Sequence, residues 1–249
     1  MIETLEGVIG SGKTYLAVSR IAAHLSHGGT VCTNIDIIES GLQIAMLQMF
    51  GQHWDGEGLV RFDEDMTSQF WKICPRGTTE MNVLCAVDEA QMWWGSRETR
   101  AFPKGLELWL QQSRKLHIDI IFMCQSGDDL DVKIRRQVRW SWRMMDLQAI
   151  RIPFLGLSMP WPMTMAFQVD ARRNVVYQRT FIKRSVLLYN SYRTDAILRP
   201  VEFAGEVKGR RQIKKKARVN LWVFSLPQKI GILILLFVVG VLVRINLSM

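Results

Sequence analysis

The residue pattern with the clearest chemistry runs from Gly7 to Thr14, near the start of the chain. Its letters, GVIGSGKT, fit the phosphate-binding pattern G-x-x-x-x-G-K-[ST] at every required position. Small residues let backbone N–H groups close around a phosphate, and the N-terminus of a following helix adds partial positive charge. The Lys13 ammonium would reach the β- and γ-phosphates, and the Thr14 hydroxyl would bind Mg²⁺. The pattern predicts ATP binding by Gly7, Gly10, Ser11, Gly12, Lys13 and Thr14.

The residues on either side of this loop suit it. Residues 2–6 alternate like a β-strand, and residues 15–27 have the pattern of a helix that ends at Gly28 and Gly29. A working phosphate loop needs this order of strand, loop and helix, whereas a chance match in a glycine-rich turn does not. The order therefore favours a functional loop. No signal-peptide pattern precedes the first strand.

A second chemical pattern, at residues 83–89, reads Val-Leu-Cys-Ala-Val-Asp-Glu. A continuous apolar run is typical of a buried parallel strand, and this run ends in two carboxylates. Asp88 would hold Mg²⁺ through its water shell, and Glu89 would be the general base that polarises the attacking water. A solvated strand end is the alternative, because many buried strands end in acids. The preceding phosphate loop favours catalysis, namely hydrolysis of ATP.

A third strand with a polar tip is predicted at residues 118–125, after a helix at 105–115. Some ATPases carry an extra strand between the phosphate-loop strand and the Asp-Glu strand, and its tip residue contacts the γ-phosphate or the attacking water. Gln125 occupies this tip and is therefore a candidate catalytic residue. A polar residue that merely closes a strand would have the same spacing.

The remaining elements must build a sheet around these residues. The patterns predict strands at 30–36, 140–152, 165–170 and 175–182, helices at 40–50 and 131–139, and a variable insertion with some helix at 51–79. We expect an antiparallel extension of the sheet edge over about residues 140–185. Arginines and aromatic residues interleave there. Nucleic-acid contact is one interpretation, and a solvated sheet face is the one we favour.

Composition and charge limit the class of protein. The 249 residues allow one sizeable α/β domain plus an accessory piece. Residues 1–127 carry 10 Lys and Arg against 15 Asp and Glu, whereas residues 128–249 carry 22 against 8. This asymmetry predicts a basic region that meets nucleic acid or an anionic membrane. The four cysteines form no CxxC pair and have no ligand-spaced His, which favours reduced thiols of a cytoplasmic domain over a zinc site.

The chain changes character at about residue 204. Seven Lys and Arg and no acid occupy residues 208–218, and residues 230–243 carry no charge. This apolar run has 14 residues, fewer than the ~20 that a spanning helix needs, so a buried core helix is an alternative. Its basic and aromatic flank and its lack of an amphipathic period favour a membrane anchor. We expect a basic juxtamembrane linker at 204–220 and a single-pass anchor at 221–247.

In the order of its motifs the sequence resembles the zonula occludens toxin (Zot-like) family, the inner-membrane assembly ATPases of filamentous phages. The resemblance covers roughly residues 1–200. The phosphate loop and the Asp-Glu pair occur in many ATPases, whereas their order with Gln125 and a late Tyr-x-Ser-Tyr element is more specific. The matching features are Gly7 to Thr14, Thr33-Asn34, Val87-Asp88-Glu89-Ala90-Gln91, Ser113-Arg114-Lys115 before Asp119-Ile120-Ile121, Gln125, and Leu188-Tyr189-Asn190-Ser191-Tyr192.

The resemblance implies an α/β fold in residues 1–203, a P-loop NTPase of the ASCE class similar to FtsK–HerA proteins. Its central sheet would be mostly parallel with antiparallel edge strands, and a C-terminal transmembrane helix would follow. The family also implies a homo-oligomer, with a hexameric ring as one form. Arg114 falls where such rings carry an arginine that reaches a neighbour's γ-phosphate, so it is a candidate arginine finger. A local cap or ion pair is the alternative for Arg114.

The function implied is ATP-driven assembly and extrusion of a filamentous single-stranded DNA phage, with phage DNA, coat protein or both as partners. The protein would lie in the host inner membrane, with its ATPase domain in the cytoplasm and its basic linker on anionic lipid. Family members commonly continue into a periplasmic domain, whereas few residues follow Val243 here. One alternative is therefore a genome-packaging ATPase in the virion membrane of an icosahedral phage. A nucleotide-gated scaffold that binds ATP without hydrolysing it is another.

Overall fold

The computed structural model describes residues 1–97, 102–147 and 163–193. The chain divides into two units, residues 1–200 and 201–249, and the second lies outside the described residues. The predicted linker at 204–220 and the predicted anchor at 221–247 therefore fall outside them and stay predictions. Within the described ranges, no helix has the length and apolar character that crossing a membrane requires.

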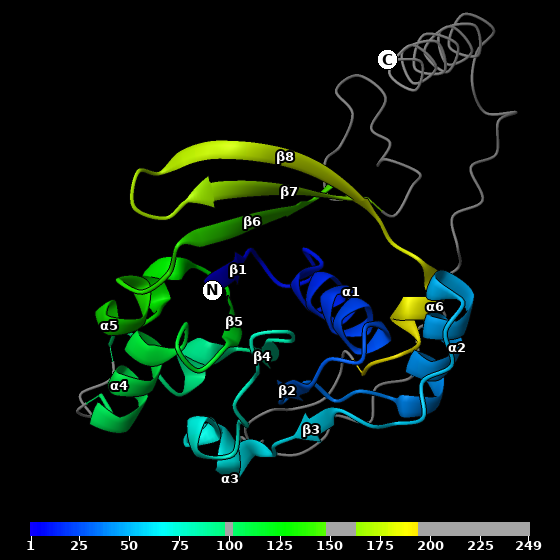
Figure 1. Ribbon diagram of the computed structural model, residues 1–249. Helices are drawn as coiled ribbons and strands as arrows, with labels where there is room; N and C mark the ends of the chain where they lie inside the picture. Colours follow the sequence, from blue (N-terminus) through cyan, green and yellow to red (C-terminus); the bar gives the residue numbers. More distant parts are fainter. Residues whose placement is uncertain (98–101, 148–162, 194–249) are drawn as a thin grey trace, which may run out of the picture. The chain divides into compact units, whose positions relative to one another are not determined.

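One eight-stranded sheet forms the centre of the first unit, in the order β3-β2-β4-β5-β1-β6-β7-β8. Neighbours from β3 to β6 are parallel, and β7 and β8 add antiparallel beyond β6 (Figure 1). The mostly parallel α/β sheet with antiparallel edge strands is thus confirmed. The strands are β1 (Ile2–Glu6), β2 (Val31–Thr33), β3 (Leu59–Arg61), β4 (Val83–Val87), β5 (Ile118–Cys124), β6 (Trp140–Asp146), β7 (Met163–Asp170) and β8 (Val175–Lys183).

Helices cover both faces of the sheet. Figure 1 shows α1, α2 and α6 on one face and α4 and α5 on the other. The helices are α1 (Lys13–Ser26), α2 (Glu39–Phe50), α3 (Glu64–Thr67), α4 (Lys104–Gln112), α5 (Val132–Arg135) and α6 (Val186–Tyr189), with 3₁₀ turns at Phe70–Lys72, Ala90–Met92 and Gly127–Asp129. Each face carries its own apolar core, because β4 and β5 are apolar at almost every position and so present apolar side chains to both faces.

The position of strand β5 brings the phosphate loop and the Asp88-Glu89 pair to the same edge of the sheet. Strand β5 lies between β1 and β4, in register with both, so that Ile120 is opposite Ile2 on one side and Cys85 on the other. The carboxyl ends of these three parallel strands consequently lie at one edge of the sheet. This edge carries the phosphate loop after β1 and the Asp88-Glu89 pair after β4.

The segment predicted as a variable insertion, residues 51–79, is part of the core. Phe70 is fully buried, and its ring centroid lies 5.2 Å from that of Trp109 and 5.4 Å from that of Trp94. Strand β3 in the same segment pairs with β2, and the sequence did not predict it. Three residues are too few to show an alternating pattern, and the chain turns into β3 through left-handed Gly56 and Gly58.

The predicted antiparallel extension over about residues 140–185 begins with a strand of mixed pairing. Strand β6 pairs antiparallel with β7 on one side and parallel with β1 on the other, and the parallel pairing was not predicted. The connection from β5 returns the chain to the start of β1, where the Arg139 N–H donates to the Ile2 carbonyl at 3.0 Å. This connection holds only the short α5 and a 3₁₀ turn, whereas the sequence predicted a helix over 131–139. The predicted strand residues after 147 lie outside the described ranges.

Candidate nucleotide-binding site

The phosphate loop joins β1 to α1 and depends on its glycines. The angle φ is 153° at Gly7, 81° at Gly10 and 97° at Gly12, a region that residues with a Cβ rarely adopt. A Cβ on Gly7 would come within 2.7 Å of the Met144 carbonyl oxygen, and one on Gly12 within 2.8 Å of Thr164 Oγ1. The loop therefore needs glycine both for its conformation and for the close approach of β6 and β7.

Lys13 and Ser11 present polar groups to the inside of the loop. The Lys13 ammonium donates to the carbonyl oxygens of Gly7 at 2.8 Å and Val8 at 3.3 Å. The Ser11 hydroxyl is buried and has no hydrogen-bond partner in the described part of the chain. Gly12 caps α1 without a side chain, so the first N–H groups of the helix are available to a ligand. These features suit a ligand with several acceptor oxygens, such as a triphosphate.

Asp88 lies directly opposite the end of the phosphate loop. The Thr14 hydroxyl is 3.3 Å from Asp88 Oδ2, and the other carboxylate oxygen accepts from the Glu89 N–H at 2.9 Å. Burial, followed by the charge of Glu89, raises the pKa of Asp88 from 3.8 to about 6. A hydroxyl and a carboxylate beside a phosphate loop are the oxygen ligands that Mg²⁺ takes together with substrate phosphates. Thr14 and Asp88 thus fit a Mg²⁺ site.

Glu89 is held in an unusual backbone conformation. Its φ is 47°, in the left-handed region, and its carboxylate accepts a hydrogen bond from the Gln91 side chain. Outliers of this kind persist where surrounding structure over-determines them, and they cluster at functional sites. Glu89 lines a hollow of about 280 Å³ together with Lys13, Thr14 and Asp88. The structure therefore brings the predicted general base to the phosphate loop.

Asn34 is a site residue to which the sequence assigned no role. Its side-chain oxygen accepts from the Asp88 N–H at 2.7 Å, and its amide donates to the Asp88 carbonyl at 3.1 Å. This pair of hydrogen bonds fixes the backbone of Asp88 from the tip of the neighbouring strand β2. The available signal was its place in the Thr33-Asn34 element of the family resemblance.

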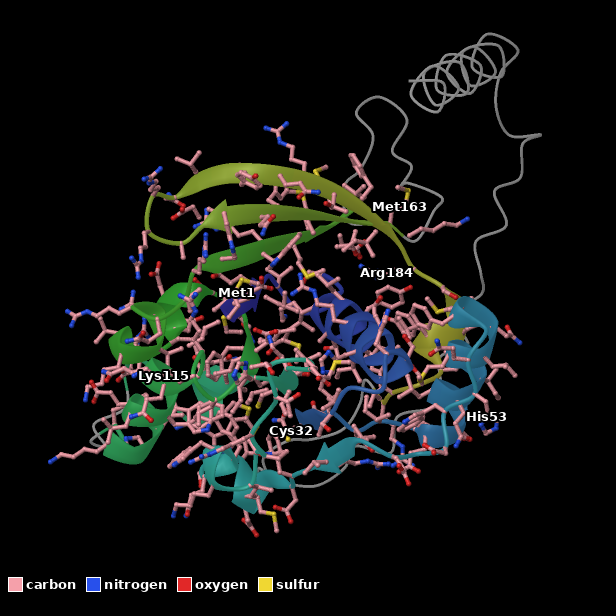
Figure 2. The ribbon with its side chains drawn as sticks, viewed as in Figure 1. Met1, Cys32, His53, Lys115, Met163 and Arg184 are labelled. Carbon is pink, nitrogen blue, oxygen red and sulfur yellow. The ribbon has the colours of Figure 1, made fainter. Side chains whose placement is uncertain are left out.

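Arg184 and Thr164 hold the outer side of the loop and were also missed by the sequence. The Thr164 hydroxyl donates to the Ser11 carbonyl at 3.0 Å, and Arg184 Nη2 donates to the Gly10 carbonyl at 3.2 Å. Arg184 also donates to Thr164 Oγ1 and forms an ion pair with Asp146 at 3.4 Å. Figure 2 shows Arg184 between the antiparallel strands and α1. The antiparallel strands thus contact the phosphate loop directly.

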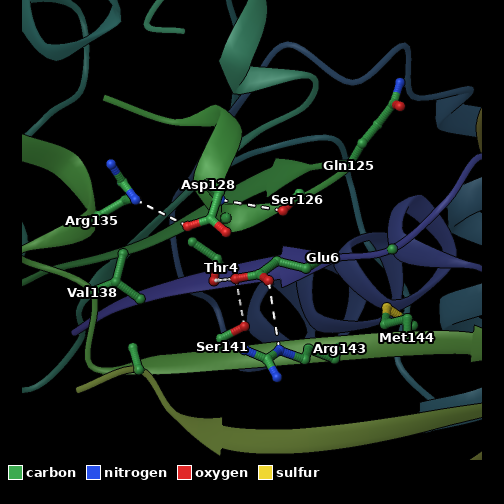
Figure 3. A pocket seen from close by; sticks show the side chains of 13 residues that line it. Thr4, Glu6, Gln125, Ser126, Asp128, Arg135, Val138, Ser141, Arg143 and Met144 are labelled. Atoms are coloured by element: carbon green, nitrogen blue, oxygen red, sulfur yellow. Dashed lines mark hydrogen bonds and ion pairs between the residues drawn. The ribbon is translucent and has the colours of Figure 1, made fainter. Parts of the chain in front are cut away.

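The Gln125 side chain does not line the hollow that Lys13, Thr14, Asp88 and Glu89 share. The backbone carbonyl of Gln125 accepts from the Gly7 N–H at 3.1 Å, so this residue stands at the predicted strand tip. Its side chain is exposed and lines a second pocket of about 500 Å³, with Glu6, Asp128 and Arg143 (Figure 3). In this pocket Glu6 accepts from Thr4 and Ser141 and faces Arg143 at 3.9 Å. A catalytic role for Gln125 stays a prediction.

Arg114 lies away from the phosphate loop of its own chain. It sits in the turn between α4 and the start of β5, and β5 runs parallel to β1. The start of β5 is therefore at the sheet edge opposite to the loop. A contact of Arg114 with nucleotide within one subunit is excluded by this placement, and the role between subunits stays a prediction.

Comparison with known proteins places this site in a family. A family model described as Zonular occludens toxin (Zot) matches residues 1–196. The chain belongs to this family. Similar proteins include the Gene 1 protein of Salmonella phage IKe, 29% identical over 139 residues, and that of Escherichia phage If1, 28% identical over 164 residues. The matches cover 54% and 62% of this chain but only 37% and 44% of the two relatives.

Solved structures similar to the Zot-family chain include the N-terminal domain of zonular occludens toxin from Neisseria meningitidis. It is 21% identical, with a TM-score of 0.44, and the match covers 77% of this chain and 98% of that one. Another is the genome packaging NTPase from Sulfolobus turreted icosahedral virus 2 in complex with ATP-gammaS. It is 13% identical, with a TM-score of 0.46, and the match covers 74% of this chain and 98% of that one.

Replacing Asn34 tests how much the Zot-family site depends on the fixed backbone of Asp88. We expect Asn34→Ala to lower kcat/KM for ATP by about 10–100-fold, as loss of a residue that orients a metal ligand typically does. Asn82→Ala is the matched control, because it removes a 3.0 Å hydrogen bond to Asp119 at the other end of β4. Equal kinetics of the two variants would contradict the role of Asn34.

Replacing Arg184 tests the contact between the antiparallel strands and the loop. We expect Arg184→Ala to weaken ATP binding by about tenfold, because a charge-assisted hydrogen bond to the loop is lost. Titration calorimetry on the full chain measures this change, with Arg179→Ala on the exposed part of β8 as the control. Unchanged ATP affinity in Arg184→Ala, with thermal stability alone reduced, would show that Arg184 only stabilises the fold.

Proposed function

We propose that this chain is a membrane-anchored ATPase that powers assembly and extrusion of a filamentous single-stranded DNA phage through the host inner membrane. The observation that carries the proposal is the 3.3 Å contact between Thr14 Oγ1 and Asp88 Oδ2. It joins a phosphate loop to a carboxylate that lies 74 residues further along the chain. Membership of the Zot family, with phage Gene 1 proteins among the relatives, supports the biological setting.

The site supports hydrolysis of ATP by a defined set of groups. The loop N–H groups and the Lys13 ammonium would bind the phosphates, and Thr14 and Asp88 would hold Mg²⁺. When bound, Mg²⁺ neutralises charge that develops on the phosphate oxygens. Glu89 would accept a proton from the attacking water. The oxygen of that water forms a bond to the γ-phosphorus of ATP, while the bond between this phosphorus and the oxygen that leaves with ADP breaks. Asn34 keeps Asp88 in place during this step.

The proposal extends to the membrane and to the partners. The seven basic residues at 208–218 would contact anionic lipid, and residues 221–247 would anchor the ATPase domain on the cytoplasmic side. The moving partners would be phage DNA, coat protein or both. Several copies would assemble, a hexameric ring being one form, with Arg114 of one subunit at the γ-phosphate of the next.

A complementation experiment tests this function in the host cell. Phage lacking the gene is supplied with the wild-type protein, with Lys13→Ala or with Glu89→Gln. We expect both variants to leave phage single-stranded DNA and coat protein inside the cell and to release no particles. Particle release at the wild-type level by either variant would contradict an ATP-driven role. Recovery of the protein as a subunit of purified virions would contradict extrusion and favour genome packaging.

A further inference from the structure

Aromatic side chains form one wall of the hollow above the phosphate loop. Tyr189 and Tyr192 come from the segment after β8, and Tyr15 comes from the first turn of α1. All three line the same hollow as Lys13 and Thr14. The hydrolysis chemistry described above uses none of these rings.

The three tyrosines differ in how much of each ring is open. Tyr15 and Tyr192 are each only 4% exposed, whereas Tyr189 is 43% exposed. The Tyr189 ring centroid lies 6.3 Å from that of Tyr15 and 5.7 Å from that of Tyr192. Tyr189 is therefore a partly exposed, half-open aromatic residue whose ring packs against two buried tyrosine rings.

Hydrogen bonds before and after α6 fix this wall in place. The Tyr15 hydroxyl accepts from the Ser185 N–H at 2.8 Å, just before α6. After α6, the Ser191 carbonyl accepts from the Ile38 N–H at 2.8 Å. Gly41 permits this approach, since a Cβ there would lie 2.3 Å from the Asn190 carbonyl oxygen. A wall held in this way binds a flat ligand with little loss of conformational entropy.

The wall belongs to the hollow that would receive a nucleotide. The loop N–H groups would take the α- and β-phosphates, the Lys13 side chain would reach the β- and γ-phosphates, and the Thr14 hydroxyl would bind Mg²⁺. The nucleoside then extends from the α-phosphate into the part of the hollow that the phosphates leave free, and Tyr15, Tyr189 and Tyr192 line this hollow. Tyr15 is the next residue after Thr14, and Tyr189 lies against it. We infer that the half-open Tyr189 ring stacks on the base of the bound nucleotide.

This inference rests on the proposed ATP binding and adds the residue that takes the nucleoside. Stacking on an aromatic ring is worth about 1–3 kcal/mol per base and tolerates different bases, because every base has a π-face. The Tyr189 contact therefore favours nucleotides over bare phosphate chains, and it discriminates little between ATP and GTP. A tyrosine that only packs α6 against α1 would affect stability and would leave this preference unchanged.

The test compares two ligands that share phosphates and differ in the nucleoside. Titration calorimetry on the detergent-solubilised full chain measures binding of the adenylyl imidodiphosphate–Mg²⁺ complex and of tripolyphosphate–Mg²⁺. The variants are Tyr189→Ala, Tyr189→Leu, which keeps apolar packing without a flat ring, and Tyr189→Phe, which keeps the ring. Tyr177→Ala is the matched control, because Tyr177 is 74% exposed on β8 and does not line the hollow.

We expect loss of the Tyr189 ring to weaken binding of the ligand that carries a nucleoside and to leave binding of tripolyphosphate unchanged. Tyr189→Ala and Tyr189→Leu should bind the ATP analogue roughly ten- to a hundredfold more weakly and tripolyphosphate as the wild type does. Tyr189→Phe and Tyr177→Ala should bind both ligands as the wild type does. Equal weakening of both ligands, or no weakening of either, would overturn the stacking role and leave ATP binding standing. Wild-type protein that binds neither ligand would overturn the proposed function as well.

Discussion

Glu89→Gln is expected to lower ATP turnover by about 10²–10⁴-fold while leaving ATP binding intact. The amide keeps the size of the side chain and its contact with Gln91, but it cannot take a proton from the attacking water. General-base catalysis by a positioned carboxylate contributes about 10²–10⁴-fold, so kcat should fall by that factor. The measurement is phosphate release by the full chain at saturating ATP, with ATP affinity determined separately by calorimetry.

The control for this variant is Glu80→Gln, which changes an exposed carboxylate before the start of β4. Its turnover should equal that of the wild type. If Glu89→Gln hydrolysed ATP at the wild-type rate, Glu89 would not be the general base. If the wild type bound ATP without turnover, a nucleotide-gated scaffold would describe the protein better than a motor.

Asp88→Asn is expected to make the protein more stable and less active. Because the pKa of Asp88 is about 6 in the folded protein and 3.8 in the unfolded chain, the folded state binds more protons between these values. Stability contributed by this group is therefore present at low pH and lost as pH rises through 6. Removing the charge should raise the free energy of unfolding at pH 7.5 by up to about 3 kcal/mol.

The same substitution should lower Mg²⁺-dependent ATP turnover by about a hundredfold or more, since a neutral amide is a poor ligand for Mg²⁺. Thermal unfolding without nucleotide or Mg²⁺, at pH 7.5 and at about pH 4, measures the stability change. The free energy of unfolding of Asp88→Asn should exceed that of the wild type at pH 7.5 and should be close to it at about pH 4. If Asp88→Asn were less stable than the wild type at pH 7.5, the hydrogen bonds to the Asp88 carboxylate would stabilise the folded protein by more than the burial of its charge destabilises it.

The predictable part of the site consists of residues whose roles follow from local patterns. The phosphate loop depends on glycine spacing within eight residues, and Asp88 follows a run of apolar residues that marks a central strand. Because both strands end at the same edge of a parallel sheet, the meeting of Thr14 with Asp88 follows from their order. The sequence therefore predicted the loop, Asp88 and Glu89 at one place, and the structure brings them together.

The residues whose roles the sequence missed act across long separations. Asn34 bonds Asp88 from 54 residues away, and Thr164 bonds Ser11 from 153 residues away. Arg184 likewise reaches the Gly10 carbonyl only because β7 and β8 fold back over the loop. Such contacts depend on strand order and register, which the sequence does not encode in any window of residues. The parallel pairing of β6 with β1 was not predicted, for the same reason.

The most direct test of the account is ATP hydrolysis by the detergent-solubilised full chain, measured with Mg²⁺ and with no DNA, single-stranded DNA or double-stranded DNA. We expect Mg²⁺-dependent turnover that single-stranded DNA raises more than duplex DNA does, and that Glu89→Gln lowers by about 10²–10⁴-fold under every condition. Preferential stimulation by duplex DNA would contradict extrusion of a single-stranded genome and favour packaging. Absence of turnover in the wild type, or equal turnover in Glu89→Gln, would contradict the claim that this phosphate loop and its carboxylates form an ATPase site.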